Sequence, residues 1–281
     1  MSLEPGIFAK TFQRASLDEG LDAAAASGMR FLQFNMSCAG LASLPDAVEP
    51  ALAAAVHDGF ARRGLVMSAV SGTFNMIHPD RSRRAADLDR LGLLIETCKA
   101  LGTSVITLCT GTRDPENMWR WHADNASPQA WRDLLASLGR VLPAAEARGV
   151  TLAFESEPAN VIDRPQKAKR LLEELRSPAL KVVLDAANLF HPGELVRMAE
   201  IIPQACDLLG GEIVLAHAKD LSPDGSVVAA GKGVLNYDLY LSELLRAGYS
   251  GPLILHDLAE EEVAGSLAFL NAARERNISW N

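Results

Sequence analysis

Eight short runs of apolar residues recur along the chain, and polar or helix-like stretches separate them. Most of these runs are almost continuously apolar, which is typical of parallel strands that are buried on both faces. The pattern therefore predicts eight strands, at residues 6–12, 31–36, 65–70, 104–109, 150–155, 181–185, 213–217 and 252–256.

The stretches between the runs carry helix signals. Ser16 and Glu19 form a capping box in front of an alanine-rich segment that ends near Gly28. Ser127 followed by Pro128 is typical of a helix N-cap and first helical position. Helical spacing of apolar residues, capping residues and closing glycines predict helices at 16–28, 50–63, 80–101 and 127–149, from 165 onward, and at 193–210, 237–247 and 260–276.

Eight alternations of strand and helix in a chain of 281 residues predict an α/β fold, the (β/α)8 TIM barrel. The alternative is an open doubly wound sheet, but no GxGxxG motif follows a first strand to favour it. No linker rich in proline, serine or glycine divides the sequence. We therefore expect a single TIM-barrel domain over residues 1–281.

Four of the apolar runs end on a side chain that can bind a metal ion. The runs TLAFE, KVVLD, EIVLAH and PLILH end on Glu155, Asp185, His217 and His256. In a barrel the carboxyl ends of the strands share one rim, which carries the functional residues. Two carboxylates and two imidazoles suit one divalent ion such as Mn²⁺, Zn²⁺, Co²⁺ or Fe²⁺, whereas Mg²⁺ or Ca²⁺ would be less natural.

Charge and hydropathy narrow the classes of function. The net charge of -8 and the pI of about 5.3 argue against nucleic-acid binding, which needs a basic surface. No apolar stretch reaches the roughly 18 to 20 residues that span a bilayer, and the N-terminus has no basic start followed by an apolar core. We expect a cytoplasmic protein without nucleic-acid or membrane partners.

The order and spacing of six motifs resemble those of a known superfamily. The motifs are SGTFNMIHPD (71–80), FESEPAN (154–160), VVLDAANLF (182–190), LAHAKD (215–220), GKGVLNY (231–237) and GYSGPLILH (248–256). Together they are similar to the xylose isomerase-like TIM-barrel superfamily, which includes sugar epimerases, ketose isomerases, inosose dehydratases and endonuclease IV. The resemblance spans nearly the whole chain and implies one divalent metal ion and a small carbohydrate substrate.

By this resemblance, Glu155, Asp185 and His217 match three metal ligands of the family. The fourth ligand is usually a glutamate at the end of the eighth strand, where this chain has His256. A histidine can replace that glutamate as a ligand but not as a carboxylate base, and the family's epimerases use the glutamates of the fifth and eighth strands as a pair. A second departure is Asn188, which stands where a substrate-contacting histidine is usual and can still hydrogen-bond a hydroxyl.

Three residues are candidates for moving a proton. Glu157 and Lys219 lie two residues beyond Glu155 and His217, so they face the same side of the sheet if the strands continue. Together with Glu155 they form the predicted catalytic set, in which the lysine could stabilise an enediolate or act as an acid. The alternatives are a salt bridge at the rim for Glu157 and pairing with a neighbouring carboxylate, such as Asp220, for Lys219.

Further residues are predicted to bind substrate. His78 follows the third apolar run, in a loop that faces the pocket in the superfamily. The loop at 111–125 holds Trp119, Trp121 and His122 next to one another, and large aromatic side chains in a polar loop often cover a sugar ring. The alternative is that these aromatic side chains pack the loop against the barrel.

These observations favour a metal-dependent isomerase or epimerase that acts on a small sugar or sugar derivative through an enediolate. The alternative within enzymes is dehydration of a keto-cyclitol or dehydroshikimate-like substrate, and the missing eighth-strand glutamate favours it. A nuclease is disfavoured by the six histidines and the acidic charge, and a non-catalytic metal or sugar binder is a third class. Dimers and tetramers are common among relatives, so a homo-oligomer is compatible with the resemblance.

Overall fold

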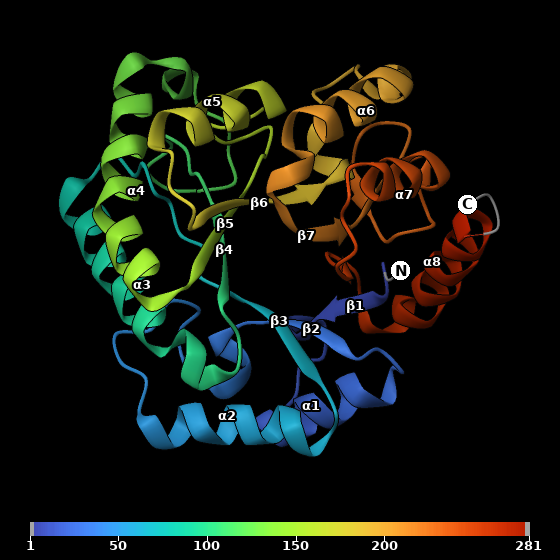
Figure 1. Ribbon diagram of the computed structural model, residues 1–281, viewed down its shortest axis with the longest axis horizontal. Helices are drawn as coiled ribbons and strands as arrows, with labels where there is room; N and C mark the ends of the chain where they lie inside the picture. The colour runs from blue at the N-terminus through green and yellow to red at the C-terminus, as the bar shows by residue number, and fades with distance from the viewer. Residues whose placement is uncertain (1–2, 279–281) are drawn as a thin grey trace.

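Eight parallel strands close into a barrel in the computed structural model, which describes residues 3–278. Figure 1 shows the helices as a ring around these strands. The predicted TIM barrel is confirmed, and residues 1–2 and 279–281 of the predicted domain lie outside the described residues. The barrel strands are β1 (Pro5–Phe8), β2 (Phe31–Phe34), β3 (Val66–Ser71), β4 (Val105–Cys109), β5 (Thr151–Glu155), β6 (Leu180–Asp185), β7 (Ile213–Ala218) and β10 (Leu253–Leu255).

Each strand is hydrogen-bonded to the next along the barrel, in the order β1-β10-β7-β6-β5-β4-β3-β2. The barrel closes because β1 pairs in parallel with both β10 and β2. Two further strands, β8 (Asp220–Leu221) and β9 (Val227–Val228), form a separate antiparallel ribbon in the loop after β7. This ribbon lies outside the barrel.

A helix follows each barrel strand and covers the outer face of the barrel. Apolar side chains of the helices and of the outer strand faces form the main hydrophobic core. The helices are α1 (Leu17–Ala26), α2 (Pro50–Arg62), α3 (Arg81–Leu101), α4 (Pro128–Arg148), α5 (Pro165–Leu175), α6 (Met198–Leu209), α7 (Tyr237–Arg246) and α8 (Val263–Ile278).

The helix boundaries follow from their capping residues. Ser16 Oγ accepts a hydrogen bond from the backbone N–H of Glu19, and the Glu19 carboxylate accepts one from the N–H of Ser16, so the predicted capping box is confirmed. At α4, Ser127 accepts from the N–H of Ala130. The same helix ends at Gly149, whose φ of 59° is a left-handed conformation that glycine adopts without strain.

Several predicted elements are shorter in the structure than in the sequence pattern, and three of them show a 3₁₀ turn as the reason. β1 ends at Phe8 because the chain turns there into a 3₁₀ helix, Ala9–Thr11. β2 ends at Phe34 because Asn35 caps a second 3₁₀ helix. The segment predicted as one helix at 193–210 begins with a separate 3₁₀ turn before α6. Apolar periodicity continues through these tight turns, so it does not locate them.

A small apolar layer fills the inside of the barrel below the strand ends. Five strands contribute one buried side chain each to this layer: Ala69, Ala153, Val183, Leu215 and Ile254. On β1 the inward-facing position is occupied by Gly6. A larger residue does not fit there, because a Cβ would lie 2.5 Å from the carbonyl oxygen of Phe31. The layer closes the floor on which the polar side chains of the strand ends stand.

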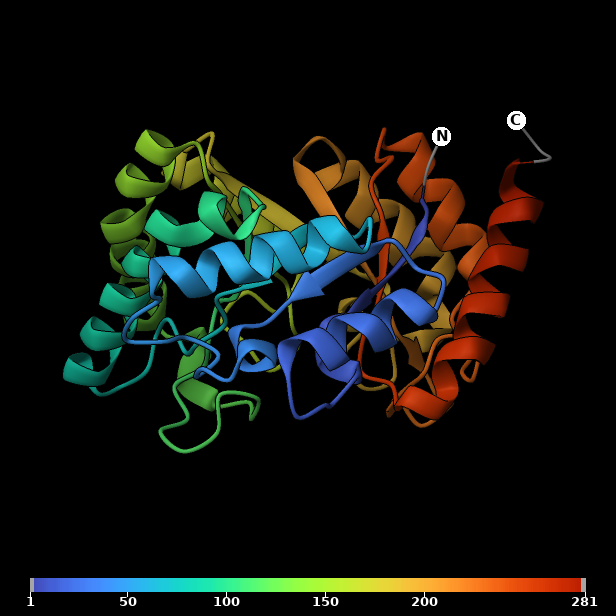
Figure 2. The same cartoon turned by 90° about the horizontal axis from the view of Figure 1, so that it is seen from below.

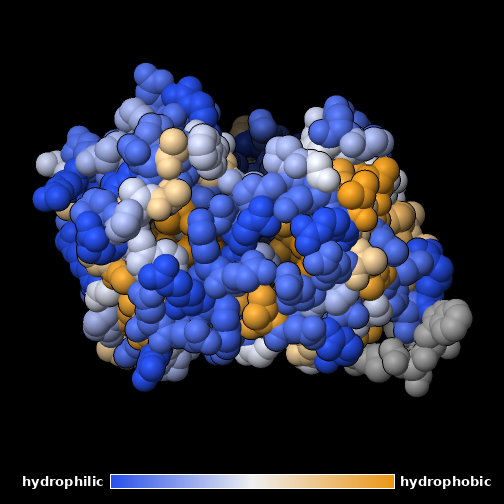
Figure 3. Space-filling view, turned by 90° about the horizontal axis from the view of Figure 1, so that it is seen from above, coloured by the Kyte–Doolittle hydropathy of each residue, from blue (hydrophilic) through white to orange (hydrophobic). Residues whose placement is uncertain are grey.

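The outer surface of the described chain is largely polar. In Figure 3 hydrophilic residues dominate the face shown, and apolar residues form small separate patches. Among residues 3–278, no helix is both long and apolar enough to cross a membrane. Two exposed aromatic side chains, Trp119 and Trp121, both belong to the loop after β4, and Figure 2 shows this green segment projecting beyond the helices at the bottom of the view.

Candidate functional site

Polar side chains at the strand ends stand directly above the apolar layer inside the barrel. Residues two apart on a strand face the same side of the sheet. Each of four members of the layer, Ala153, Val183, Leu215 and Ile254, is therefore followed two positions later by a side chain at the barrel mouth: Glu155, Asp185, His217 and His256. This alternation explains why the sequence pattern located these four residues.

Three of the four form a compact group that can hold a metal ion. The ligand atoms of Glu155, Asp185 and His217 all lie within 4.8 Å of one another, and all three residues are buried. Nδ1 of His217 lies 3.3 Å from Oε2 of Glu155 and 3.8 Å from Oδ2 of Asp185. Two carboxylates and one imidazole are a donor set that divalent transition ions accept.

Gln33, on β2, orients the imidazole of His217. Oε1 of Gln33 accepts a hydrogen bond from Nε2 of His217 over 2.8 Å, which places the ring proton on Nε2. The lone pair of a neutral ring is then on Nδ1, the atom that faces the two carboxylates. Sequence reasoning missed Gln33. Its position two residues after Phe31 indicates that it faces the barrel interior, but not that it meets His217.

Unpartnered atoms in this group fit a bound cation. Nδ1 of His217 is buried and makes no hydrogen bond. Oδ2 of Asp185 is also buried without a hydrogen bond, although the ammonium of Lys219 lies 3.1 Å from it, and Oδ1 of Asp185 accepts a hydrogen bond from the N–H of Ala187 over 2.9 Å. Buried polar atoms without a partner are costly, and a lone pair directed at carboxylate oxygens is more so. A divalent ion between these atoms would satisfy all of them.

His256, the predicted fourth ligand, is not a member of the compact group found among the described residues. Its ring stacks on the ring of His217 with centroids 4.9 Å apart, and on the ring of Phe8 at 4.7 Å. Burial lowers the pKa of His256 and favours its neutral form, which suits a stacked ring. The structure thus places His256 beside the His217 ring.

Lys219 lies at the centre of the charged cluster. Its Nζ is 3.1 Å from Oδ2 of Asp185, 3.2 Å from Oδ2 of Asp257 and 4.0 Å from Oε1 of Glu155. Burial opposes the charge on Lys219, but the three carboxylates outweigh it and raise the pKa well above the usual value. Burial also opposes ionisation of Glu155, yet the His217 ring and the Lys219 ammonium beside it lower its pKa to about 2.

Two more predicted residues lie against this cluster. Asn188 follows β6, and its Nδ2 donates to Oε1 of Glu155 over 2.7 Å. Glu157 accepts a hydrogen bond from Asn160 over 3.2 Å, and burial together with the charge of Glu155 raises its pKa well above the ordinary value. The environments of the two carboxyl groups therefore shift their pKa values in opposite directions, down for Glu155 and up for Glu157.

The match to a family model covers most of the chain. The model describes the xylose isomerase-like TIM barrel and matches residues 21–273. The chain belongs to the xylose isomerase-like TIM barrel family. Comparison with curated proteins finds no significant match.

Solved structures at low identity share the fold of this xylose isomerase-like barrel. A D-tagatose 3-epimerase-like protein is 16% identical with a TM-score of 0.76, and 98% of each chain is covered. The 3-keto-D-glucoside 4-epimerase of E. coli is 16% identical with a TM-score of 0.75, covering 96% of this chain and 100% of that one. An IolI protein with a bound zinc atom is 17% identical with a TM-score of 0.74, and 98% of each chain is covered. The chain also spans 43% of a longer fusion protein that joins such a barrel to a 4-hydroxyphenylpyruvate dioxygenase.

In this xylose isomerase-like barrel, His78 joins two loops. Its Nδ1 accepts a hydrogen bond from the N–H of Asp80 over 3.1 Å, so Nε2 carries the proton and donates to the carbonyl oxygen of Pro115, also over 3.1 Å. Both ring nitrogens are thus engaged with the backbone, and the substrate contact by His78 stays a prediction. The ring links the loops after β3 and β4.

Buried asparagines, which sequence reasoning missed, hold the base of the loop after β4. Nδ2 of Asn75 donates to the carbonyl oxygen of Thr112 over 2.8 Å, and its Oδ1 accepts from the N–H of Thr112 over 3.0 Å. Oδ1 of Asn125 accepts from Oγ1 of Thr112 over 3.1 Å, and Asn160 accepts from the N–H of Gly111. These contacts attach the loop to the neighbouring loops of the family barrel.

The aromatic residues predicted to cover substrate lie farther out on that loop. Trp119 and Trp121 are 54% and 59% exposed, so they do not pack the loop against the barrel. His122 is half-buried, and its Nδ1 accepts a hydrogen bond from the N–H of Asp124 over 3.2 Å. Substrate covering by the two tryptophans and His122 stays a prediction.

The residue after Lys219 organises the next loop. The carboxylate of Asp220 accepts hydrogen bonds from the N–H groups of Leu221, Gly231 and Leu235. A Cβ on Gly233 would lie 2.3 Å from Oδ1 of Asp220, which explains the GKG motif as close packing of backbone against this carboxylate. Lys219 therefore pairs with other carboxylates, not with Asp220.

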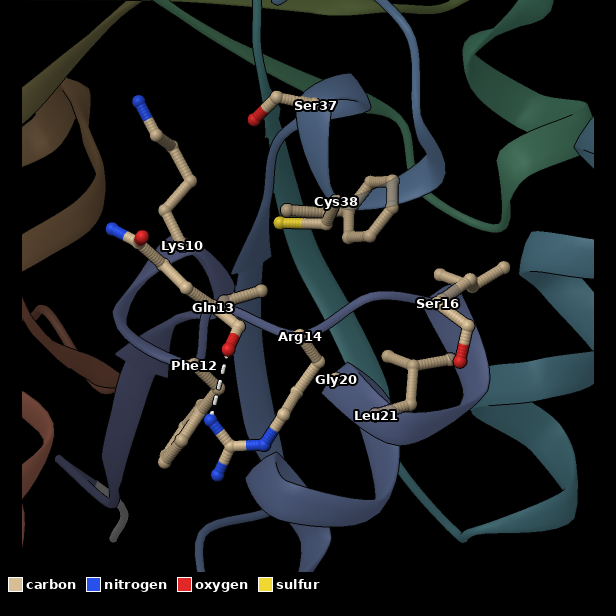
Figure 4. A pocket seen from close by; sticks show the side chains of 12 residues that line it. Lys10, Phe12, Gln13, Arg14, Ser16, Gly20, Leu21, Ser37 and Cys38 are labelled. Atoms are coloured by element: carbon tan, nitrogen blue, oxygen red, sulfur yellow. Dashed lines mark hydrogen bonds between the residues drawn. The ribbon is translucent and has the colours of Figure 1, made fainter.

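A separate cavity of about 280 Å³ lies beside the ends of β1 and β2 (Figure 4). The side chains of Lys10, Gln13 and Ser37 extend toward the same side of this view. Nζ of Lys10 lies 6.0 Å from the centre of the Phe8 ring, and Phe8 stacks on His256. The cavity thus borders the barrel mouth through Phe8, but none of its lining residues belongs to the predicted site.

Replacing Gln33 with leucine is expected to weaken the affinity for a divalent ion about 10- to 100-fold, because the imidazole of His217 loses the acceptor that fixes its proton on Nε2. The affinity is measured by competition of Co²⁺ or Zn²⁺ with a chromophoric chelator. The matched control is Gln13→Leu, which removes an amide that lines the separate cavity. An affinity within about twofold of the wild type for Gln33→Leu would contradict this role.

Proposed function

We propose that this chain is a metal-dependent isomerase or epimerase of a small sugar or sugar derivative, and that it moves a proton next to a carbonyl group through an enediolate. The observation that carries the proposal is the buried group of Glu155, Asp185 and His217 at the mouth of the barrel, whose ligand atoms all lie within 4.8 Å of one another. Family membership and the sugar epimerases among the structural neighbours support the same class of reaction.

The three residues of the group would hold one divalent ion, with Mn²⁺, Zn²⁺, Co²⁺, Fe²⁺ and Mg²⁺ as candidates. When bound, such an ion supplies positive charge that stabilises negative charge on carbonyl and hydroxyl oxygens. We assign His256 to supporting the His217 ring, because its own ring lies on that of His217 with centroids 4.9 Å apart. Gln33 supports the same imidazole through its Nε2 proton.

The chain's own side chains divide the remaining work. Lys219 is positively charged and directs its ammonium into the cluster, so it suits stabilisation of the oxyanion of an enediolate. Glu157 has a raised pKa, which suits a group that takes up and returns a proton. Glu155 is ionised and accepts a hydrogen bond from Asn188, so its main role would be that of a metal ligand. Lone pairs of its carboxylate that remain free could also accept a proton from the second face of the sugar.

Solvent exchange tests this proposal with a panel of substrates. Protein stripped with a chelator and reloaded with Mn²⁺ or Co²⁺ is incubated in D₂O with ketopentoses, ketohexoses, 3-keto-glucosides and keto-cyclitols. Magnetic resonance and mass spectrometry then report deuterium at the carbon next to the carbonyl, the formation of an epimer or isomer, and the loss of water. Deuterium together with an epimer or isomer is the expected result. Loss of water as the main product would assign the chain to the dehydratases, and no exchange with any substrate would contradict the proposal.

A further inference from the structure

Lys219 and the candidate metal site use the same carboxylates. Its Nζ lies 3.1 Å from Oδ2 of Asp185 and 4.0 Å from Oε1 of Glu155, and both residues belong to the compact group. The third carboxylate near Nζ, that of Asp257 at 3.2 Å, does not belong to the group. The ammonium is therefore held between the metal site and a carboxylate outside it.

A divalent ion and this ammonium would oppose each other. Metal–oxygen distances are about 2.0 to 2.2 Å, so an ion on Oδ2 of Asp185 could lie no more than about 5 Å from the ammonium in its present place. Like charges at such a distance in a buried site repel strongly, since little water screens them. Lys219 is 7% exposed and Asp185 is 2% exposed, so little water screens the charges between them.

The backbone of Asp257 is arranged to bring its carboxylate to Lys219. Its φ of 53° is left-handed, which is uncommon outside glycine and is tolerated by aspartate and asparagine. A costly conformation persists where the surrounding contacts favour it. Here Oδ2 lies 3.2 Å from Nζ of Lys219 and Oδ1 lies 3.1 Å from Nδ1 of His256.

We propose that Lys219 competes with the divalent ion for Asp185, and that Asp257 draws the ammonium aside so that the ion can bind. Asp257 is then a positioning residue that acts on the metal through Lys219. It lies two residues beyond the end of β10, directly after His256. The inference rests on the metal site of the proposed function and adds a control of that site by an ion pair.

A double-mutant cycle on metal affinity tests this inference. The Kd for Mn²⁺ or Co²⁺ is measured by chelator competition for the wild type, Lys219→Met, Asp257→Asn and the double variant. Lys219→Met is expected to tighten binding about tenfold, because it removes the competing charge. Asp257→Asn is expected to weaken binding about tenfold in the wild type, yet to change it no more than about twofold in the Lys219→Met background. Asparagine keeps the tolerance of the left-handed backbone.

Controls separate this inference from a general charge effect and from misfolding. Glu261→Gln removes an exposed negative charge from the 3₁₀ helix Glu260–Glu262, which follows the loop of Asp257, and is expected to leave the Kd unchanged. Circular dichroism and thermal melting check that each variant is folded, and Lys219→Gln provides a second neutral variant at that position.

Two results would overturn the inference. Equal weakening by Asp257→Asn with and without Lys219 would mean that Asp257 acts on the ion directly, and unchanged affinity in both backgrounds would leave Asp257 without a part in metal binding. Either result with a wild type that binds the ion leaves the proposed function standing. A wild type that binds no divalent ion would instead remove the metal site itself.

Discussion

Replacing Asp185 with asparagine is expected to lower the affinity for Mn²⁺ or Zn²⁺ by more than about 100-fold and to abolish measurable solvent exchange. Loss of a partner that merely orients a ligand costs about 10- to 100-fold, and Asp185 is itself placed to be a ligand. The change keeps the shape of the side chain, and the carbonyl oxygen of the amide can still accept the hydrogen bond from Ala187. Metal bound per chain after dialysis, and kcat/KM with the best substrate, are the two measurements.

The matched control for Asp185→Asn is a carboxylate at the amino-terminal ends of the strands, opposite the barrel mouth. Glu212 lies just before β7 and pairs with Lys181. Glu212→Gln is expected to retain the metal and the activity, since it removes the same charge far along the strands. Metal content in Asp185→Asn equal to that of the wild type would contradict the assignment of the site.

Replacing Lys219 with methionine is expected to slow turnover about 100- to 10,000-fold while the protein keeps its metal. Methionine fills a similar volume but cannot place a positive charge within 3.1 Å of Asp185 or on the oxyanion of an enediolate. The measurement is kcat for exchange and for product formation at saturating metal. Loss of turnover with retained or tighter metal binding separates a catalytic role from a structural one.

The matched control for this lysine lies in the loop after β7. Lys232 is exposed and pairs with Glu262, so Lys232→Met removes a lysine without touching the buried cluster. It is expected to leave kcat within about twofold of the wild type. A normal kcat in Lys219→Met would mean that Lys219 only balances the charges of the neighbouring carboxylates and takes no part in catalysis.

The fold and the core of the candidate site could be predicted because both follow from short-range regularities. Parallel strands buried on both faces read as continuous apolar runs, and the end of such a run marks the rim of the barrel. Glu155, Asp185 and His217 each end a run, and the structure brings their ligand atoms within 4.8 Å. Asn188 comes from the resemblance to the family, in which a substrate-contacting histidine usually stands at its position, and in the structure it donates to Glu155.

The remaining parts of the site depend on contacts that no local pattern encodes. The spacing that places His256 at the rim does not reveal that its ring stacks on those of Phe8 and His217. Gln33 is a single polar residue in a short strand, and only closure of the barrel brings it to His217, 184 positions away in sequence. Asp257 depends on a left-handed backbone after β10, which its residue type permits but does not require.

The loop after β4 shows the same limit for substrate-binding residues. Its polar composition and its tryptophans drew attention to Trp119 and Trp121, which the structure leaves exposed. The asparagines that anchor the loop, Asn75 and Asn125, look like ordinary turn residues in the sequence. Their role follows only from the buried backbone groups to which they are hydrogen-bonded.

The most direct test of the account is the dependence of solvent exchange on bound metal. Chelator-stripped wild-type protein is titrated with Mn²⁺ or Co²⁺ in D₂O, in the presence of the best carbohydrate substrate, and deuterium incorporation is followed by magnetic resonance. We predict no exchange in the stripped protein and a rate that rises linearly until one ion per chain is bound, with a sharp break there. Exchange at full rate in the stripped protein, or a rate that does not respond to the bound ion, would contradict the central claim that Glu155, Asp185 and His217 form the metal site of an isomerase or epimerase.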